Sequence, residues 1–198
     1  MTDVVLASKS APRAAILAGA GVPHEVVGSG VDEAEAKNRL LAEGAGPRDI
    51  AGRLAEAKAV AVSAVRPGAI VIGADQTLDL DGALFDKVET LAEARDRLIA
   101  LRGRSHRLHS AIVAAENGVP LWRAIESPRL HMRAISDAFL DGYLARGGAA
   151  LLGSVGCYML EGEGAQLFER IEGDYFAILG LPLLPLLKFL RGKGAIAA

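Results

Sequence analysis

The spacing of hydrophobic and polar residues divides the chain into short strands and amphipathic helices. Residues 69–76 form an apolar, mostly β-branched run after the Pro67-Gly68 turn signal, which predicts a strand buried on both faces. Apolar residues at helical spacing predict a helix over residues 47–65. The same patterns predict further strands over residues 3–7, 25–27, 104–115, 121–134 and 166–171, and helices over residues 11–19, 90–102, 136–147 and 182–190.

The order of these elements predicts the fold class. Strands and helices alternate in the first half, while Asn117-Gly118 is a hairpin signal in the second. We therefore expect an α/β fold with a mixed sheet, flanking helices and a cleft between two lobes. No repeat, low-complexity tract or linker divides the sequence, so we expect one domain over residues 1–198.

Composition narrows the class of protein. A chain that is 51% hydrophobic and 23% charged is globular, and its net charge of -2 argues against a nonspecific grip on nucleic acid. The single cysteine, Cys157, excludes an internal disulfide and fits a reducing compartment. The N-terminus lacks signal-peptide features, and prolines interrupt the apolar run 178–190 before it could span a bilayer. We expect a cytoplasmic protein without membrane or nucleic-acid partners.

Asp75 is the first candidate for chemistry, because it follows the apolar run. In open α/β sheets the polar residue at the carboxyl end of such a strand points into the ligand crevice. The alternative is that Asp75 only ends the strand and starts a turn toward Asp81-Gly82. The strand pattern alone leaves both interpretations open.

Three further segments supply charged or polar residues that are candidates beside Asp75. Ser8, Ser10 and Arg13 flank a predicted helix start, which is either an anion site or an ordinary capped helix with exposed cations. Lys58 lies on the apolar face of its helix and must either extend to the rim or meet an anion. The acidic start near residue 35 is typical of a solvated helix end. His106 and His109 lack a metal-ligand pattern and are interpreted as structural or rim residues.

Taken together, several segments resemble the Maf family, the septum-formation inhibitor-like nucleoside triphosphate pyrophosphatases. The resemblance covers nearly the whole chain. It implies a mixed α/β fold with a central nucleotide cleft, and hydrolysis of a nucleoside triphosphate to the monophosphate and pyrophosphate. The segments that carry it are Leu6-Ala7-Ser8-Lys9-Ser10-Ala11-Pro12-Arg13, Val31-Asp32-Glu33, Leu54-Ala55-Glu56-Ala57-Lys58-Ala59, Gly73-Ala74-Asp75-Gln76, Lys87, Gly162-Glu163-Gly164 and Leu179-Gly180-Leu181-Pro182-Leu183.

The resemblance also implies roles for individual residues. A triphosphate needs several cations and a divalent metal to offset its charge. Mg²⁺ or Mn²⁺ is expected because the available ligands, Asp75 and Glu33, are carboxylates. The implied catalytic residues are Asp75 as proton acceptor with Glu33, Lys58 and Lys87, and the implied phosphate-binding residues are Ser8, Ser10 and Arg13.

Three positions that tune base choice in the family are Pro12, Gln76 and Glu161 here. Gln76 and Glu161 resemble the branch that acts on 7-methyl-GTP. By the same resemblance, members of that branch carry a tryptophan at the position of Pro12, and a proline cannot replace it as a stacking platform. Two alternatives are a nucleotide-binding regulator of septum formation or cell division with little catalysis, and a broad hydrolase of noncanonical purines. The sequence leaves a homodimer open.

Overall fold

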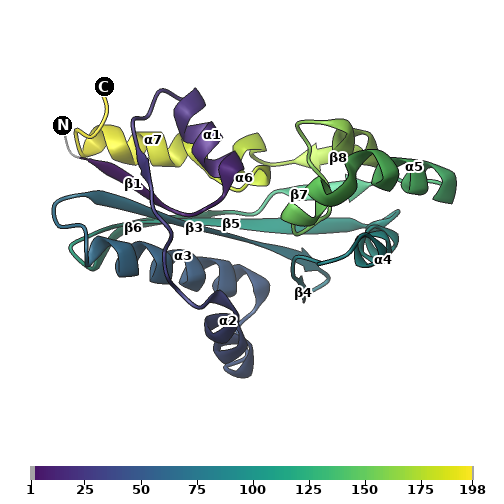
Figure 1. Cartoon of the computed structure of the whole chain (residues 1–198), viewed down its shortest axis with the longest axis horizontal. Helices are drawn as coiled ribbons and strands as arrows, with labels where there is room; N and C mark the ends of the chain where they lie inside the picture. Colours follow the sequence, from purple (N-terminus) through teal and green to yellow (C-terminus); the bar gives the residue numbers. More distant parts are fainter. Residues whose placement is uncertain (1–2, 198) are drawn as a thin grey trace.

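A computed structural model describes residues 3–197, which form a mixed sheet of eight strands covered by helices on both faces (Figure 1). The strand order is β2-β1-β3-β5-β7-β8, with β4 paired to β3 and β6 paired to β5. This architecture confirms the predicted fold class. The strands are β1 (Val4–Ala7), β2 (Glu25–Val26), β3 (Ile70–Leu80), β4 (Ala83–Phe85), β5 (Ser105–Glu116), β6 (Val119–Glu126), β7 (Arg129–Met132) and β8 (Phe168–Glu172).

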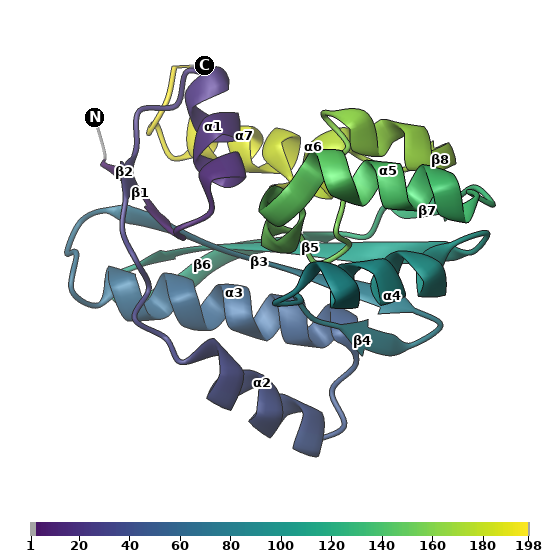
Figure 2. The ribbon, with the colours of Figure 1, turned by 45° about the vertical axis from the view of Figure 1, so that its right-hand side comes forward.

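The helices lie in two layers. Figures 1 and 2 show α3 beneath the middle of the sheet with α2 below it, while α1, α5 and α7 lie above the sheet. The helices are α1 (Ala11–Gly19), α2 (Glu33–Ala42), α3 (Pro47–Ser63), α4 (Leu91–Leu101), α5 (Asp137–Gly147), α6 (Tyr175–Ile178) and α7 (Leu183–Gly192), with 3-10 turns at Gly148–Gly153 and Glu163–Leu167. Within residues 3–197, every helix is too short or too polar to span a bilayer.

Two large apolar clusters correspond to the two lobes. The first joins α1 and α7 to the beginning of β3 and the end of β5, and contains Leu17, Ile72 and Leu186. The second joins α4 and α5 to the end of β3 and the beginning of β5, around Leu78 and Leu108. Strands β3 and β5 therefore run through both lobes.

Strand β3 is longer than the sequence pattern predicted, and this changes the setting of Asp75. Its first residues pair in parallel with β1, from Val4 opposite Ile70 to Ala7 opposite Gly73. The strand then continues to Leu80 and turns into β4. The expectation that Asp75 ends the strand is wrong: Asp75 lies inside β3, just beyond the last residue that β1 covers.

Gly73 sets the distance between β3 and α3. A Cβ atom built on Gly73 would lie 2.1 Å from the Ala55 carbonyl oxygen and 2.5 Å from the Ala59 nitrogen. The helix backbone thus rests directly on the strand, which only a residue without a side chain permits. Lys58, next to Ala59 on α3, is brought within reach of β3 by this contact.

The second half of the chain departs from prediction at one strand. The hairpin at Asn117-Gly118 is confirmed, and both residues have the positive φ that a tight two-residue turn requires (50° and 78°). The returning strand predicted over residues 121–134 is wrong as a single element. It consists of β6 and β7, which pair with different parts of β5. Pro128, which has no N–H to donate, lies in the break between them.

His106 and His109 are buried structural residues and do not lie at a rim. His106 Nε2 is 2.6 Å from the Tyr158 hydroxyl, and its Nδ1 is buried without a hydrogen-bond partner among the described residues. His109 lies between the Ser127 hydroxyl (2.8 Å) and Asp79 (3.1 Å). Both side chains are thus held by protein groups.

The buried His106 makes the fold sensitive to acid. Burial, with a smaller contribution from His131, lowers the pKa of His106 to about 4. The unfolded chain therefore binds more protons than the folded chain between about pH 6.5 and 4, and stability falls as the pH falls through this range. From pH 7.5 to 5 we expect a loss of about 2 kcal/mol in the free energy of unfolding, measured by urea denaturation.

Two variants isolate this effect. His106→Gln keeps a side chain that can bond to Tyr158 and removes the titrating ring, so its stability should depend less on pH by about the same 2 kcal/mol. His24→Gln, at a half-buried histidine, is the matched control and should keep the wild-type dependence. An unchanged pH dependence in His106→Gln would contradict the assignment to His106.

Candidate active site

A cavity of about 940 Å³ opens between the lobes at the middle of β3. Its walls come from the β1–α1 loop, the start of α2, α3, β3, the β4–α4 segment and residues 153–161. The structure thus brings together side chains that are far apart in the sequence. All ten predicted site residues line it: Ser8, Ser10, Pro12, Arg13, Glu33, Lys58, Asp75, Gln76, Lys87 and Glu161.

Lys58 joins two carboxylates in the floor of this cavity. Its Nζ donates to Asp75 Oδ1 at 2.7 Å and lies 2.8 Å from Glu33 Oε2. The Lys58 and Asp75 side chains are 5% and 11% exposed, whereas Glu33 is 54% exposed. Of the two alternatives for Lys58, the structure supports the one in which it meets an anion.

The environment of Asp75 favours its protonated form. Burial raises the pKa of Asp75 above that of an exposed carboxyl, and the charge of Glu33 acts in the same direction. The nearby positive charges of Lys58 and Arg13 oppose this rise without cancelling it. Asp75 is therefore a stronger proton acceptor than an exposed carboxylate, which suits a general base.

Arg13 is fixed at the start of α1 by three acceptors. Its Nε donates to the Gly180 carbonyl at 2.8 Å, and its Nη1 donates to Ser8 Oγ at 3.2 Å and to the Ala74 carbonyl at 3.0 Å. Burial lowers the pKa of Arg13, although the charges of Asp75 and Glu33 favour the protonated guanidinium. The cation is thus oriented beside the Lys58–Asp75 pair.

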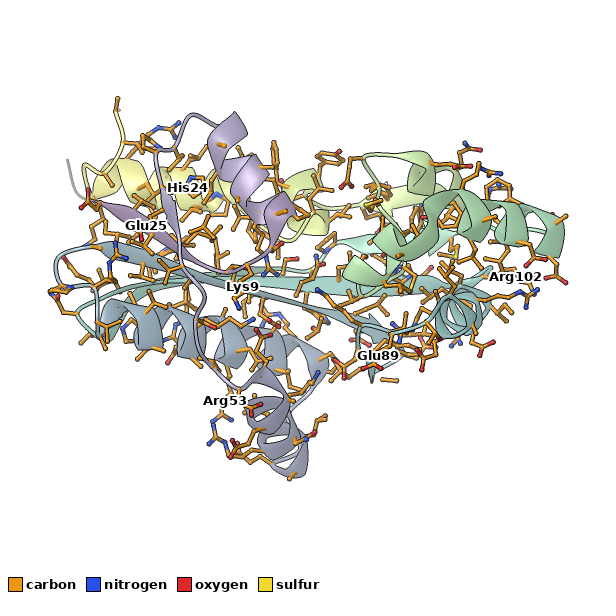
Figure 3. All side chains as sticks on the ribbon, in the orientation of Figure 1. Lys9, His24, Glu25, Arg53, Glu89 and Arg102 are labelled. Atoms are coloured by element: carbon orange, nitrogen blue, oxygen red, sulfur yellow. The ribbon has the colours of Figure 1, made fainter. Side chains whose placement is uncertain are left out.

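The hydroxyls of the β1–α1 loop face the same space. Ser10 occupies the N-cap position of α1, as predicted, but its side chain makes no capping hydrogen bond. The Ser8 hydroxyl accepts from the Ser10 N–H and from Arg13. Lys9 lies against Gly28, on the segment between β2 and α2 (Figure 3). This loop presents hydroxyls, a lysine and a helix N-terminus to the cavity, which is the chemistry of an anion site.

Glu33 and Lys87 come from the two rim segments. Asp32 caps α2 by accepting from the Glu35 N–H at 2.9 Å, and this cap places Glu33 in the first helical turn, facing Lys58. Glu35 is exposed, as its position at a helix start predicted. Lys87 is exposed between β4 and α4 and lines the cavity.

The three residues predicted to tune base choice differ in their surroundings. Gln76 Nε2 is near three internal acceptors, Ser110 Oγ (2.7 Å) and the carbonyls of Ala177 and Ile178 (3.0 Å each). Pro12 and Glu161 are exposed at the cavity wall. The amide of Gln76 is therefore a fixed part of the wall, while Glu161 faces the open space.

Sequence reasoning missed several wall residues. Leu108 and Tyr158 reach the cavity only through the pairing of β5 and the path of residues 153–161, for which no short-range signal exists. Lys37 and Asp86 also line it. A signal for Lys37 was present, because residues four apart on a helix share a face, and Lys37 follows Glu33 by four.

Two carboxylates at one point fit a hard divalent cation. Asp75 and Glu33 contact the same ammonium nitrogen, so the two carboxylates face one point of the cavity. No group of three or more His, Cys, Asp or Glu side chains suited to a metal occurs within residues 3–197. Mg²⁺ is commonly held by one or two carboxylates together with substrate phosphates, so this donor set fits it.

Comparisons with known proteins identify the family of this chain. The family model described as Maf-like protein matches residues 3–193. The chain is 61% identical to a nucleoside triphosphate pyrophosphatase of Caulobacter vibrioides, over 99% of this chain and 98% of that protein. It is 51% identical to a protein of the same name from Granulibacter bethesdensis, over 98% of each. It is also 48% identical to a 7-methyl-GTP pyrophosphatase of Rhizobium meliloti, again over 98% of each. The chain belongs to the Maf family.

Proposed function

We propose that this protein hydrolyses a nucleoside triphosphate to the monophosphate and pyrophosphate. The observation that carries the proposal is the buried Lys58, held between Asp75 and Glu33 beside a fixed Arg13 in a cavity of nucleotide size. The names of the relatives support the same reaction. We place the reaction in the cytoplasm, which the single, buried Cys157 thiol supports.

The proposed mechanism assigns one task to each group. Asp75 takes a proton from a water molecule that attacks the α-phosphorus, and pyrophosphate leaves. Lys58 holds Asp75 in place and offsets negative charge on the phosphates, while Arg13 and Lys87 bind phosphate oxygens. The Ser8 and Ser10 hydroxyls donate to the same phosphates. A divalent cation held by Asp75 and Glu33 would supply Lewis-acid charge neutralisation.

The test of the proposed function is product analysis with and without metal. We expect EDTA to stop turnover, and Mg²⁺ or Mn²⁺ to restore it, with pyrophosphate and the monophosphate as the products. The assay should run over a panel of normal and modified nucleoside triphosphates. Release of orthophosphate and the diphosphate would mean attack at the terminal phosphorus and would refute the proposal. A panel with no hydrolysis at all would favour the regulator alternative.

For the base, we propose a guanine-type substrate such as 7-methyl-GTP. Glu161 is exposed at the cavity wall, and its neighbour Glu163 is engaged by Arg146 at 2.9 Å, so the two carboxylates have different surroundings. A carboxylate only accepts hydrogen bonds, which suits the adjacent N1–H and N2–H donors of guanine. Methylation at N7 adds positive charge to the ring and strengthens that contact. The relative named for 7-methyl-GTP supports the same choice.

Glu161→Gln tests this base contact. We expect the variant to lose roughly 1–3 kcal/mol of transition-state stabilisation for guanine-type substrates, a fall of about 5- to 150-fold in kcat/KM. Activity on uridine or thymidine triphosphate should hold or rise, because an amide both donates and accepts. Glu169→Gln, at an exposed carboxylate on β8, is the control and should change neither activity. A wild-type preference for those pyrimidine substrates would contradict the proposed role of Glu161.

A further inference from the structure

An ion pair links two rim segments of the cavity. Lys37 Nζ donates to Asp86 Oδ1 at 2.5 Å, although the two residues are 49 positions apart in the chain. Lys37 lies on α2, and Asp86 lies between β4 and α4. Both residues line the cavity. The pair therefore ties two wall segments of the cavity to each other.

Each partner lies next to a residue of the proposed catalytic set. Lys37 follows Glu33 by four residues on α2, so both side chains are on the same face of the helix. Asp86 directly precedes Lys87 in the chain. The ion pair thus joins the segment that carries Glu33 to the segment that carries Lys87.

The N-terminal part of α2 combines one small apolar contact with two ion pairs. Leu40, near the end of the helix, is its buried residue and shares an apolar cluster with Ile50 and Leu54 of α3, and Ala36 packs at the edge of that cluster. Figure 2 shows α2 projecting below α3, away from the sheet. The first two turns of α2 also carry two ion pairs, from Glu33 to Lys58 and from Lys37 to Asp86. If the ammonium of Lys58 turns from Glu33 toward the phosphates of a nucleotide, the Lys37–Asp86 pair remains to hold this part of α2.

The partial burial of Lys37 makes the pair more effective than an ordinary surface ion pair. The Lys37 side chain is 22% exposed and that of Asp86 is 55% exposed. Exposed pairs contribute little because water screens them and both side chains are mobile. At Lys37 the screening is reduced, and one end of the pair is anchored on a helix.

We propose that Lys37 and Asp86 are positioning residues, which hold Glu33 and Lys87 at the correct separation for the substrate phosphates. This inference rests on the proposed pyrophosphatase function. Because a small displacement of a catalytic group lowers turnover steeply, loss of the pair should lower kcat more than it raises KM. Neither residue needs to touch the substrate for this role.

The experiment is a double-mutant cycle with a charge swap, read by pyrophosphate release. We expect Lys37→Met and Asp86→Asn each to lower kcat by about 10-fold, and the double variant to be no worse than either. The swapped protein, Lys37→Asp with Asp86→Lys, should recover to within about 3-fold of wild type. Lys37→Arg should retain most activity, because the guanidinium can also bond to the carboxylate.

A second ion pair on α2 is the matched control. Arg53 Nη1 donates to Glu43 Oε2 at 2.7 Å and ties the far end of α2 to α3. Figure 3 shows Arg53 beside α2, farther from the sheet than Lys9. Neither partner lines the cavity. Arg53→Met and Glu43→Gln should therefore keep wild-type kcat, even though they remove a tether of the same helix.

The outcomes separate a positioning role from direct contact. If Lys37 bound a phosphate itself, Lys37→Met would lose far more activity than Asp86→Asn, and the swap would not recover. That result would overturn the proposal, as would a loss confined to Asp86→Asn or wild-type activity in all variants. Amide hydrogen exchange over residues 33–37 should be faster in both single variants and slow again in the swap. Because this readout needs no turnover, it tests the pair even if the wild-type protein releases no pyrophosphate.

Discussion

Asp75→Asn should abolish pyrophosphate release while leaving the protein folded. The amide keeps the shape of the side chain but cannot accept the proton of the attacking water, so we expect kcat to fall by about two orders of magnitude or more. The measurement is single-turnover pyrophosphate release by purified protein, with binding of the nucleotide followed separately. Near-normal turnover would contradict the role of Asp75.

The stability of this variant can be predicted from the pKa of Asp75. Burial raises the pKa of this carboxyl, so the stability that it contributes is present at low pH and is lost as the pH rises through its folded-state pKa. At neutral pH the amide removes the cost of an ionised, buried carboxyl but also removes one of the two anionic partners of Lys58, which keeps Glu33, so we expect Tm to stay near that of the wild type. Asp79→Asn, on the same strand, is the control for the chemical change and should remain active.

The substitution Gly73→Ala should both destabilise the protein and inactivate it. The added methyl group would lie 2.1 Å from the Ala55 carbonyl oxygen, and backbone atoms of a helix cannot turn away as a side chain can. Helix α3 must move off β3, which we expect to cost about 3 kcal/mol or more in the free energy of unfolding. The shift carries Lys58 away from Asp75. Urea denaturation and pyrophosphate release measure the two effects.

Gly52→Ala is the matched control on the same helix. A Cβ there would meet only the tip of the Ile125 side chain at 3.0 Å, and that tip can move. Alanine also has a higher helix propensity than glycine, so we expect this variant to be neutral or more stable by roughly 0.5–1 kcal/mol. A similar loss in both variants would mean that general crowding of α3, not the contact at Gly73, limits stability.

Local patterns predicted most elements, because the signals that define them lie within a few residues. The capping box of Thr90 and Glu93 is present at the start of α4, and the left-handed turn at Asn117-Gly118 is also present. The length of β3 was underestimated, because Asp75 and Gln76 look like a strand end in the sequence. Both residues pair with β5 and therefore lie inside the strand, and no local sequence signal predicts that pairing.

The candidate site was also predictable from the sequence only in part. The motifs correctly selected ten residues that line one cavity, but they could not show which groups touch. The sequence left open whether Lys58 reaches the rim or meets an anion. Its two carboxylate partners come from α2 and β3, which loops separate from α3 in the chain. The roles of these residues stay predictions until the variants are measured.

The continuity of β3 and β5 has a mechanical consequence. These strands pair through nine consecutive residue pairs, from Val71 opposite Ala115 to Asp79 opposite Arg107, and they cross from one lobe into the other. The two lobes thus share one stiff pair of hydrogen-bonded strands. Neither lobe can rotate as a rigid body without breaking hydrogen bonds between these strands. We therefore expect the twist of the sheet to set the width of the cavity. When a substrate binds, the segments at the rim of the cavity should move, and the two lobes should not.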